Sequence, residues 1–189
     1  MKGAYIFLAD GFEDIEALGT LDILRRGGVA AATVSINNGT LEVTSAHGVT
    51  VLADMSLPEF FDAAPGTDAM LVFPGGLPGA ANLAECESLM DLAKRHFADG
   101  GPVAAICAAP GLVASQLPGI RGLKVTCYDG FEGFLQDKGA VYTGEGTVTD
   151  GRLITGRGPA FAIPFGLAIV SFLQGADVAK SVRKGLLLT

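Results

Sequence analysis

The chain has no tryptophan and is poor in cysteine, histidine and charge for its 189 residues. Its three cysteines, Cys86, Cys107 and Cys127, are an odd set without a CxxC pair, which argues against a disulfide framework and a cysteine-rich zinc site. The two histidines, His47 and His96, lie far apart in the sequence and make a poor metal-ligand set. We therefore expect neither a metal nor a cofactor.

Positive charge is also scarce, with 13 basic against 20 acidic residues and a net charge of −7. This balance argues against nucleic acid or an anionic membrane as a partner. The most apolar stretch, residues 161–173, is too short to span a bilayer, and we expect Pro164 to break it. Acidic residues follow too soon after Met1 for a signal peptide. These absences predict a soluble, cytoplasmic protein that does not bind membranes.

Short buried strands alternate with amphipathic helices along the chain, which is 49% hydrophobic. We expect strands at residues 2–8, 31–36, 70–73, 103–106 and 124–127, helices at 13–26, 87–98, 107–116, 161–173 and 177–184, and hairpins at 41–52 and 148–155. This alternation predicts an α/β fold, a doubly wound, mostly parallel sheet between helices, in one domain spanning residues 1–189. Sites in such sheets form beyond the carboxyl ends of the strands.

The segment Val103–Pro110 is the most informative part of the chain. A buried apolar strand ends on Cys107, and Pro110 suits the first turn of the helix that follows. Cys107 would then lie on a sharp strand-to-helix turn, where hydrolases with a nucleophile elbow place their reactive side chain. The nearby helix N-terminus is expected to lower the pKa of the thiol. The alternative is a buried structural cysteine. A reactive cysteine is favoured because residues 10–11 and 74–76 also follow the carboxyl ends of strands, so three segments meet where sites form in such sheets.

Four motifs, in this order, resemble the ThiJ/PfpI superfamily, and within it the branch of the human parkinsonism-associated protein deglycase. They are ADGFEDIE at residues 9–16, FPGG at 73–76, AAICAAP at 104–110 and DGRLITGRGP at 150–159. The resemblance implies a flavodoxin-like fold, similar to class I glutamine amidotransferases, and usually a homodimer. It also implies glutathione-independent glyoxalase activity, deglycation, redox sensing with chaperone behaviour under oxidative stress or, in some branches, proteolysis.

The resemblance assigns the nucleophile to Cys107 and the partner glutamate to Glu16. An ionised carboxylate beside a thiol would raise the pKa of the thiol, so only a protonated Glu16 favours the thiolate. We expect burial to raise the pKa of Glu16, whose proton then serves acid–base steps on a dicarbonyl substrate. By the same resemblance, the backbone N–H groups of Gly76 and Ala108, with Gly75 beside them, stabilise an oxyanion or an oxidised sulfur.

Two positions depart from the family pattern. Tyr128 stands where many relatives have a histidine, and because a neutral tyrosine is a poor base, a cysteine peptidase is disfavoured. Ala160 and Phe161 stand where relatives often have Gly-Thr, which changes the shape of the expected pocket. Arg157 belongs to a family motif, where it either binds an anion or orders its loop and a dimer contact. His47 is expected on a surface loop, with entry into a site across a dimer as the alternative.

Two functions stay open. In the first, the Cys107 thiolate adds to a small reactive carbonyl such as methylglyoxal, and Glu16 moves protons until lactate is released. In the second, oxidation of Cys107 makes the chain a redox-responsive protective protein. Cys127 is a weaker second redox candidate. We expect His96 to lie exposed on its helix or to flank the core, and Cys86 to have a structural role at most.

Overall fold

The computed structural model describes residues 3–188, so Lys2, the first residue of the first predicted strand, lies outside the described part. Its main sheet has the strand order β10-β11-β7-β6-β1-β2-β5. These strands are β1 (Gly3–Leu8), β2 (Ala30–Ser35), β5 (Met55–Ser56), β6 (Met70–Phe73), β7 (Val103–Ile106), β10 (Thr147–Asp150) and β11 (Leu153–Gly156). Neighbouring strands run parallel except for the antiparallel hairpin β10–β11. The predicted mostly parallel α/β sheet is therefore confirmed.

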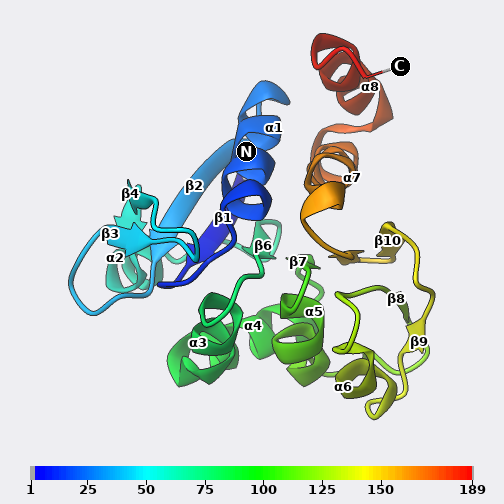
Figure 1. Ribbon diagram of the computed structural model, residues 1–189, viewed down its shortest axis with the longest axis horizontal. Coiled ribbons are helices and arrows are strands. Elements are labelled where there is room, and N and C mark those ends of the chain that lie inside the picture. The colour runs from blue at the N-terminus through cyan, green and yellow to red at the C-terminus, as the bar shows by residue number, and fades with distance from the viewer. Residues whose placement is uncertain (1–2, 189) are drawn as a thin grey trace.

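Helices cover both faces of this sheet. They are η1 (Ile15–Gly19), α1 (Thr20–Arg26), α2 (Leu57–Ala63), α3 (Gly79–Glu85), α4 (Glu87–Ala98), α5 (Ala109–Leu112), η2 (Ala114–Gln116), α6 (Glu132–Gln136), η3 (Pro159–Phe161), α7 (Ala162–Gln174) and α8 (Ala176–Gly185). Helices α1 and α7 lie on one side of the sheet, and α3, α4 and α5 lie on the other (Figure 1). The arrangement is doubly wound.

Two small sheets lie beside the main one. The hairpin of β3 (Glu42–Thr44) and β4 (Thr50–Leu52) is antiparallel, as predicted. Strands β8 (Lys124–Val125) and β9 (Val141–Tyr142) pair in parallel. The hairpin packs on the chain before η1, because Gly11 N donates to Thr44 O at 2.8 Å and Ala46 N donates to Phe12 O at 2.8 Å.

The core explains why the central strands read as uninterrupted apolar runs. Every residue of β6 and β7 is buried, as expected for parallel strands with helices on both faces. Phe7 of β1 stacks on Phe73 of β6 with ring centroids 5.2 Å apart and meets Phe60 of α2 edge-on at 5.1 Å. These contacts join the carboxyl ends of β1 and β6 to α2. Strand β7 pairs in parallel with β6, so its carboxyl end lies at the same sheet edge.

Three expectations about the helices need correction. Pro164 does not break α7, because it lies in the first turn, where backbone N–H groups have no partner within the helix. His96 is buried rather than exposed, and its Nε2 lies 3.2 Å from Pro102 O. The helix expected at residues 13–26 begins as the π-helical turn η1. Within residues 3–188, none of the helices has both the length and the apolar character needed to cross a bilayer.

Candidate active site

Cys107 lies in the turn between β7 and α5, as predicted. Its backbone has φ of +66°, in the left-handed region that residues with a Cβ rarely adopt, and such strain is found most often at functional sites. Cys107 N donates to Gly156 O at 2.9 Å, and Cys107 O accepts from Tyr128 N at 2.8 Å. Pro110 is in the first turn of α5. The turn is thus fixed on both sides, with the side chain 9% exposed.

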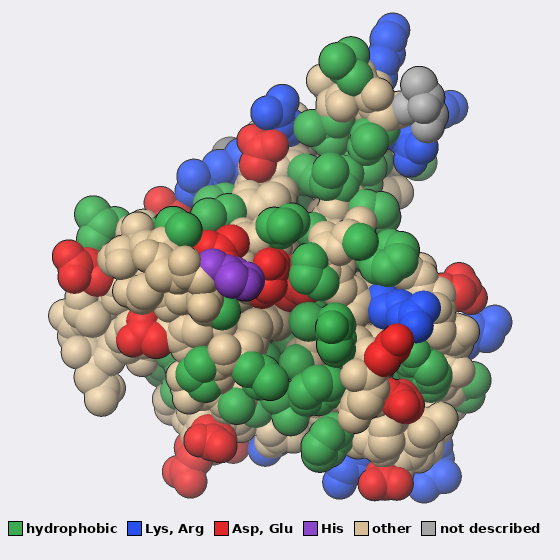
Figure 2. Space-filling model, in the orientation of Figure 1, with side chains coloured by type: hydrophobic (Ala, Val, Ile, Leu, Met, Phe, Trp, Pro, Cys, Tyr) green, Lys and Arg blue, Asp and Glu red, His purple; other side chains and the backbone are tan. Residues whose placement is uncertain are grey.

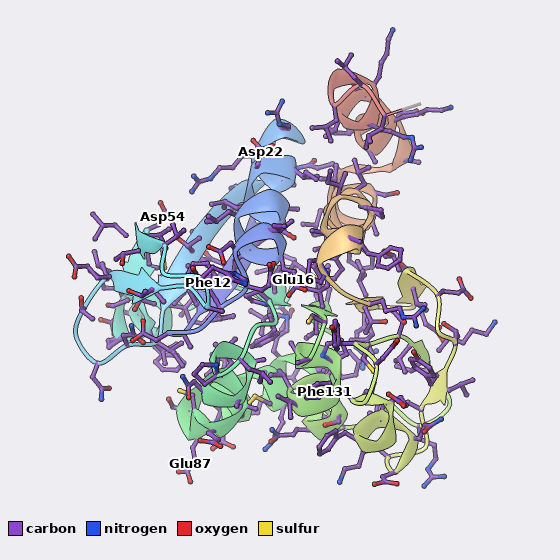
Figure 3. The ribbon with its side chains drawn as sticks, in the orientation of Figure 1. Phe12, Glu16, Asp22, Asp54, Glu87 and Phe131 are labelled. Carbon is purple, nitrogen blue, oxygen red and sulfur yellow. The ribbon has the colours of Figure 1, made fainter. Side chains whose placement is uncertain are left out.

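Glu16 reaches the same place from η1, at the lower end of the helix that continues into α1 (Figure 3). The residue is 1% exposed, and its Oε2 accepts from Gly75 N at 2.8 Å. Its own backbone N donates to Glu13 Oε2 at 2.7 Å. A carboxylate that accepts the N–H three residues later is the capping arrangement that fixes the start of a helix. Glu13 therefore holds the backbone of Glu16 at the start of this helical segment.

Gly75 lies against both the carboxyl group and the thiol. A Cβ at this position would lie 2.5 Å from Cys107 Cβ, 2.7 Å from Glu16 Oε2 and 2.9 Å from Cys107 Sγ. The next residue, Gly76, has φ of +86° and no room for a Cβ against the backbone of residues 11–13. The two glycines let the loop after β6 approach both Glu16 and Cys107 closely.

The titration of the pair follows from burial. Burial raises the pKa of Glu16 to about 7, against the lowering effect of the hydrogen bond from Gly75 N. Burial and the neighbouring Glu16 carboxylate raise the pKa of Cys107 to about 12, while hydrogen bonds from the backbones of Gly76 and Ala108 act in the opposite direction. The raised pKa of Glu16 was predicted. The expected lowering of the thiol pKa was wrong, because desolvation and a buried carboxylate outweigh the helix N-terminus.

Tyr128, whose N–H bonds to Cys107 O, lines a pocket of about 240 Å³ with Asp129, Arg157 and residues 158–161. Arg157 Nε and Nη2 donate to Asp129 Oδ1 at 2.9 and 2.7 Å, and Nη1 donates to Gly144 O at 3.0 Å. Of the two roles left open for Arg157, these bonds favour loop ordering over anion binding. Sequence reasoning missed Asp129, because no local spacing connects it to a partner 28 residues away.

The histidines occupy other places. His47 is on the β3–β4 turn, exposed, with Nδ1 2.7 Å from Asp14 Oδ2. Figure 2 shows a histidine and acidic side chains together among hydrophobic ones in the middle of this face. The ligand atoms of Glu13, Asp14 and His47 lie within 4.8 Å of one another, close enough for a divalent cation, although two of them already form an ion pair. The His96 ring lies within hydrogen-bonding distance of Pro102 O, at the opposite end of β7 from Cys107.

The other cysteines differ from Cys107 in their surroundings. Cys127 is 0% exposed, and among the described residues no backbone N–H group is found to lower the pKa of its thiol as Gly76 and Ala108 do at Cys107, which disfavours Cys127 as a second redox site. Cys86 is half-buried, with Sγ 3.8 Å from Ser88 Oγ. Cys107 alone of the three adjoins a buried carboxyl group in the described chain.

The chain is similar in sequence to known proteins along its whole length. A model of the DJ-1/PfpI family matches residues 2–172. Protein dj-1beta of Drosophila melanogaster is 35% identical over 188 residues, 99% of this chain and 97% of that protein. The Caenorhabditis elegans protein named glutathione-independent glyoxalase DJR-1.2 is 34% identical over 188 residues, with the same coverage.

Coverage differs for the relatives of Arabidopsis thaliana. Protein DJ-1 homolog A is 34% identical over 187 residues, which are 99% of this chain but 47% of that protein. The chain therefore spans about half the length of this relative.

Solved structures agree with the fold. Drosophila melanogaster DJ-1beta superposes with a TM-score of 0.90 at 34% identity and covers 100% of this chain and 98% of its own. A DJ-1 superfamily protein from Salmonella typhimurium gives a TM-score of 0.90 at 29% identity with full coverage of both chains. The match extends over β7, its elbow and the helices on both faces of the sheet.

Proposed function

The chain belongs to the DJ-1/PfpI family, and on that premise we propose that it is a cysteine-dependent glyoxalase/deglycase-type enzyme. It would act on small reactive carbonyls, converting methylglyoxal to lactate without a metal or glutathione. One observation carries the proposal: a buried carboxyl group with a pKa near neutrality adjoins a strained elbow thiol. The name of the nematode relative supports the same activity.

The reaction begins with the proton that Glu16 and Cys107 share. With this proton on Glu16, the Cys107 thiolate attacks the aldehyde carbon and a sulfur–carbon bond forms. The aldehyde oxygen takes the electron pair of its π bond and then the proton of Glu16, which gives a hemithioacetal and leaves Glu16 ionised. The N–H groups of Gly76 and Ala108 are the candidate donors to negative charge at this site.

Ionised Glu16 then acts as the base. It takes the hydrogen of the former aldehyde carbon, and the released electron pair forms an enediolate with the neighbouring ketone carbon. Return of the proton to that second carbon, with transfer of the hydroxyl proton on the first carbon to the oxygen of the second, gives a thioester. The first carbon is oxidised and the second is reduced, within one molecule. Water, losing a proton to Glu16, attacks the thioester, the thiolate leaves, and lactate is released. The net change is addition of water and release of one proton.

Proton NMR of methylglyoxal tests this proposal in a buffer free of amines. Lactate should form with the wild type and not with Cys107→Ala, and Glu16→Gln should lower the rate by at least about a hundredfold, the usual range for loss of a general acid–base. Cys86→Ala is the matched control, since Cys86 lies apart from the pair, and it should keep wild-type activity. Equal lactate formation by the wild type and Cys107→Ala would refute the proposal.

A redox role of Cys107 is the second candidate. The N–H donors of Gly76 and Ala108 that favour a thiolate also suit the oxygens of a sulfinate, which forms by oxidation of the thiolate with peroxide. Mild peroxide should then add two oxygen atoms to Cys107 before Cys86 or Cys127 reacts, as peptide mass spectrometry would show. Earlier reaction at either other cysteine would exclude this role.

We further infer that the chain acts as a homodimer. Large hydrophobic side chains stay exposed on the single chain, among them Ile15 at 57% and Leu52 at 72%. Ile15 directly precedes Glu16, so a partner that covers it would also limit access of water to the site. Light scattering of the purified protein tests this, and a monomer at micromolar concentration would refute it.

A further inference from the structure

We propose that the pocket lined by Tyr128 and Phe161 binds the non-reacting part of the substrate and selects 2-oxoaldehydes with a planar apolar group, such as arylglyoxals, over methylglyoxal. The inference rests on the proposed glyoxalase function and specifies its substrate class. The pocket has a volume of about 240 Å³, and the methyl group of methylglyoxal would leave most of it to water.

The walls of the pocket begin next to Cys107 on both sides of its backbone. Tyr128, on one wall, donates its N–H to Cys107 O at 2.8 Å. The other wall, residues 157–161, follows Gly156, whose carbonyl accepts from Cys107 N at 2.9 Å. Both walls thus start at, or one residue after, a backbone partner of Cys107, although Cys107 itself is not part of the lining. The second substituent of a Cys107-bound substrate would lie between these walls.

The chemistry of the walls favours an uncharged flat group. Tyr128, Pro159 and Phe161 present ring surfaces. The positive charge of Arg157 is paired within the wall, because its Nε and Nη2 donate to the Asp129 carboxylate and its Nη1 donates to Gly144 O. A carboxylate or phosphate on the substrate would compete with Asp129, whereas an aromatic ring displaces water and packs on the rings already present.

Phe161 is held in place from behind. A Cβ at Gly146 would lie 2.2 Å from Phe161 Cε1 and 2.3 Å from Cδ1, so the ring lies flush against the Gly146 backbone. Phe161 N also donates to Gly158 O at 2.8 Å. The ring is thus a preformed wall, and Gly146 is the residue that leaves room for it. An alanine at position 146 has to move the ring.

The decisive measurement is the ratio of kcat/KM for phenylglyoxal, which yields mandelate, to that for methylglyoxal, which yields lactate. Each reaction adds one water, oxidises the aldehyde carbon and reduces the ketone carbon of the same molecule. The two substrates differ in intrinsic reactivity, but that difference cancels when variants are compared. Phe161→Ala should lower this ratio by roughly tenfold or more, because a well-fitted apolar group contributes at least about tenfold to kcat/KM. Gly146→Ala should lower it as well.

Phe134→Ala is the matched control, since Phe134 is an exposed aromatic residue of α6 outside the pocket lining. It should leave the ratio unchanged. A ratio unaffected by Phe161→Ala, or one that Phe134→Ala lowers equally, would overturn the inference.

A binding measurement separates this inference from the proposed function. Acetophenone has the aryl ketone of phenylglyoxal but a methyl group in place of the aldehyde, so its binding to Cys107→Ala, followed by saturation-transfer NMR, requires no chemistry. Binding should be seen with Cys107→Ala and be lost when Phe161→Ala is added. If neither glyoxal is converted by the wild type, the proposed function fails, whereas the pocket is still judged by acetophenone. Equal or absent binding in the two variants would overturn the inference even for an active glyoxalase.

Discussion

The Glu16 carboxyl group and the Cys107 thiol are neighbours across Gly75, within 2.7 and 2.9 Å of the place that a Cβ of this glycine would occupy. One comes from the π-helical turn after β1 and the other from the elbow after β7. Their pKa values are raised to about 7 and about 12, so between these values the pair holds one proton and one negative charge. Four predictions follow from the pair and its surroundings.

Gly75→Ala should abolish most of the activity. The added methyl group would overlap Cys107 Cβ and Glu16 Oε2 and separate the pair, and a displacement of this size costs about a hundredfold in rate. Overpacking should also cost about 1–3 kcal/mol of unfolding free energy. Lactate formation and urea unfolding measure both effects.

The control for this variant is Gly133→Ala on α6, where a Cβ would meet nothing within 4 Å. It should keep its activity and unfold at a slightly higher urea concentration. An active Gly75→Ala variant would contradict the close approach described above.

Replacement of Glu16 by Gln should change the titration of the thiol. The negative charge of Glu16 contributes to raising the pKa of Cys107 to about 12. Without this charge, the thiol of Glu16→Gln should titrate as a single group at a lower pH than in the wild type. The ultraviolet absorbance of the thiolate reports this step, after subtraction of the same titration with Cys107→Ala. An ionisation that stays near 12 in Glu16→Gln would show that the carboxylate does not act on the thiol.

The same substitution should stabilise the protein at alkaline pH. The pKa of Glu16 is raised from 4.5 to about 7 by folding, so the folded state binds more protons and the wild type loses stability as pH rises between these values. Glu16→Gln lacks this loss and should be more stable than the wild type by on the order of 3 kcal/mol above that window, with little difference below it. Urea unfolding across this pH range measures the effect.

Glu87→Gln, at an exposed position on α4, is the control for this stability prediction. It should change the unfolding free energy by less than about 0.5 kcal/mol, without the same dependence on pH. A constant difference between Glu16→Gln and the wild type across the range would argue against a raised pKa of Glu16.

Asp129→Asn should turn the pocket into an anion site. Loss of the carboxylate frees the Arg157 guanidinium beside the pocket, so inhibition by the product lactate should strengthen severalfold and weaken again with added salt. Inhibition constants of lactate at low and high ionic strength check this. Addition of Arg157→Ala should return the inhibition to the wild-type level, and failure to do so would assign the anion to another group.

The central strands and α4 were predictable because each is bounded by local signals. Strand β6 is an apolar run that ends at Pro74 and Gly75, and β7 is one that begins directly after Pro102. Helix α4 ends just before Gly100–Gly101, with the bounds expected for it. Helix α2 was missed although Ser56 and Glu59 form a capping box before it. Strand β5 has two residues, too few for any periodicity.

The site divides in the same way. The positions of Cys107 after β7 and of Glu16 near a helix start, and the burial that raises the pKa of Glu16, were read from motifs in the sequence. The pairing of Arg157 with Asp129 and the packing of Phe161 against Gly146 could not be read from the sequence. These contacts join segments that are separated along the chain and are brought together by the strands.

The sequence by itself determined the parallel α/β architecture and placed a cysteine at a strand-to-helix elbow, since hydrophobic periodicity and turn residues act over a few neighbouring positions. Tertiary structure alone decided the direction of the thiol pKa. Desolvation and the field of Glu16 depend on distances between β7, η1 and the Gly75 loop, and these distances exist only once the sheet has brought the three segments to one edge.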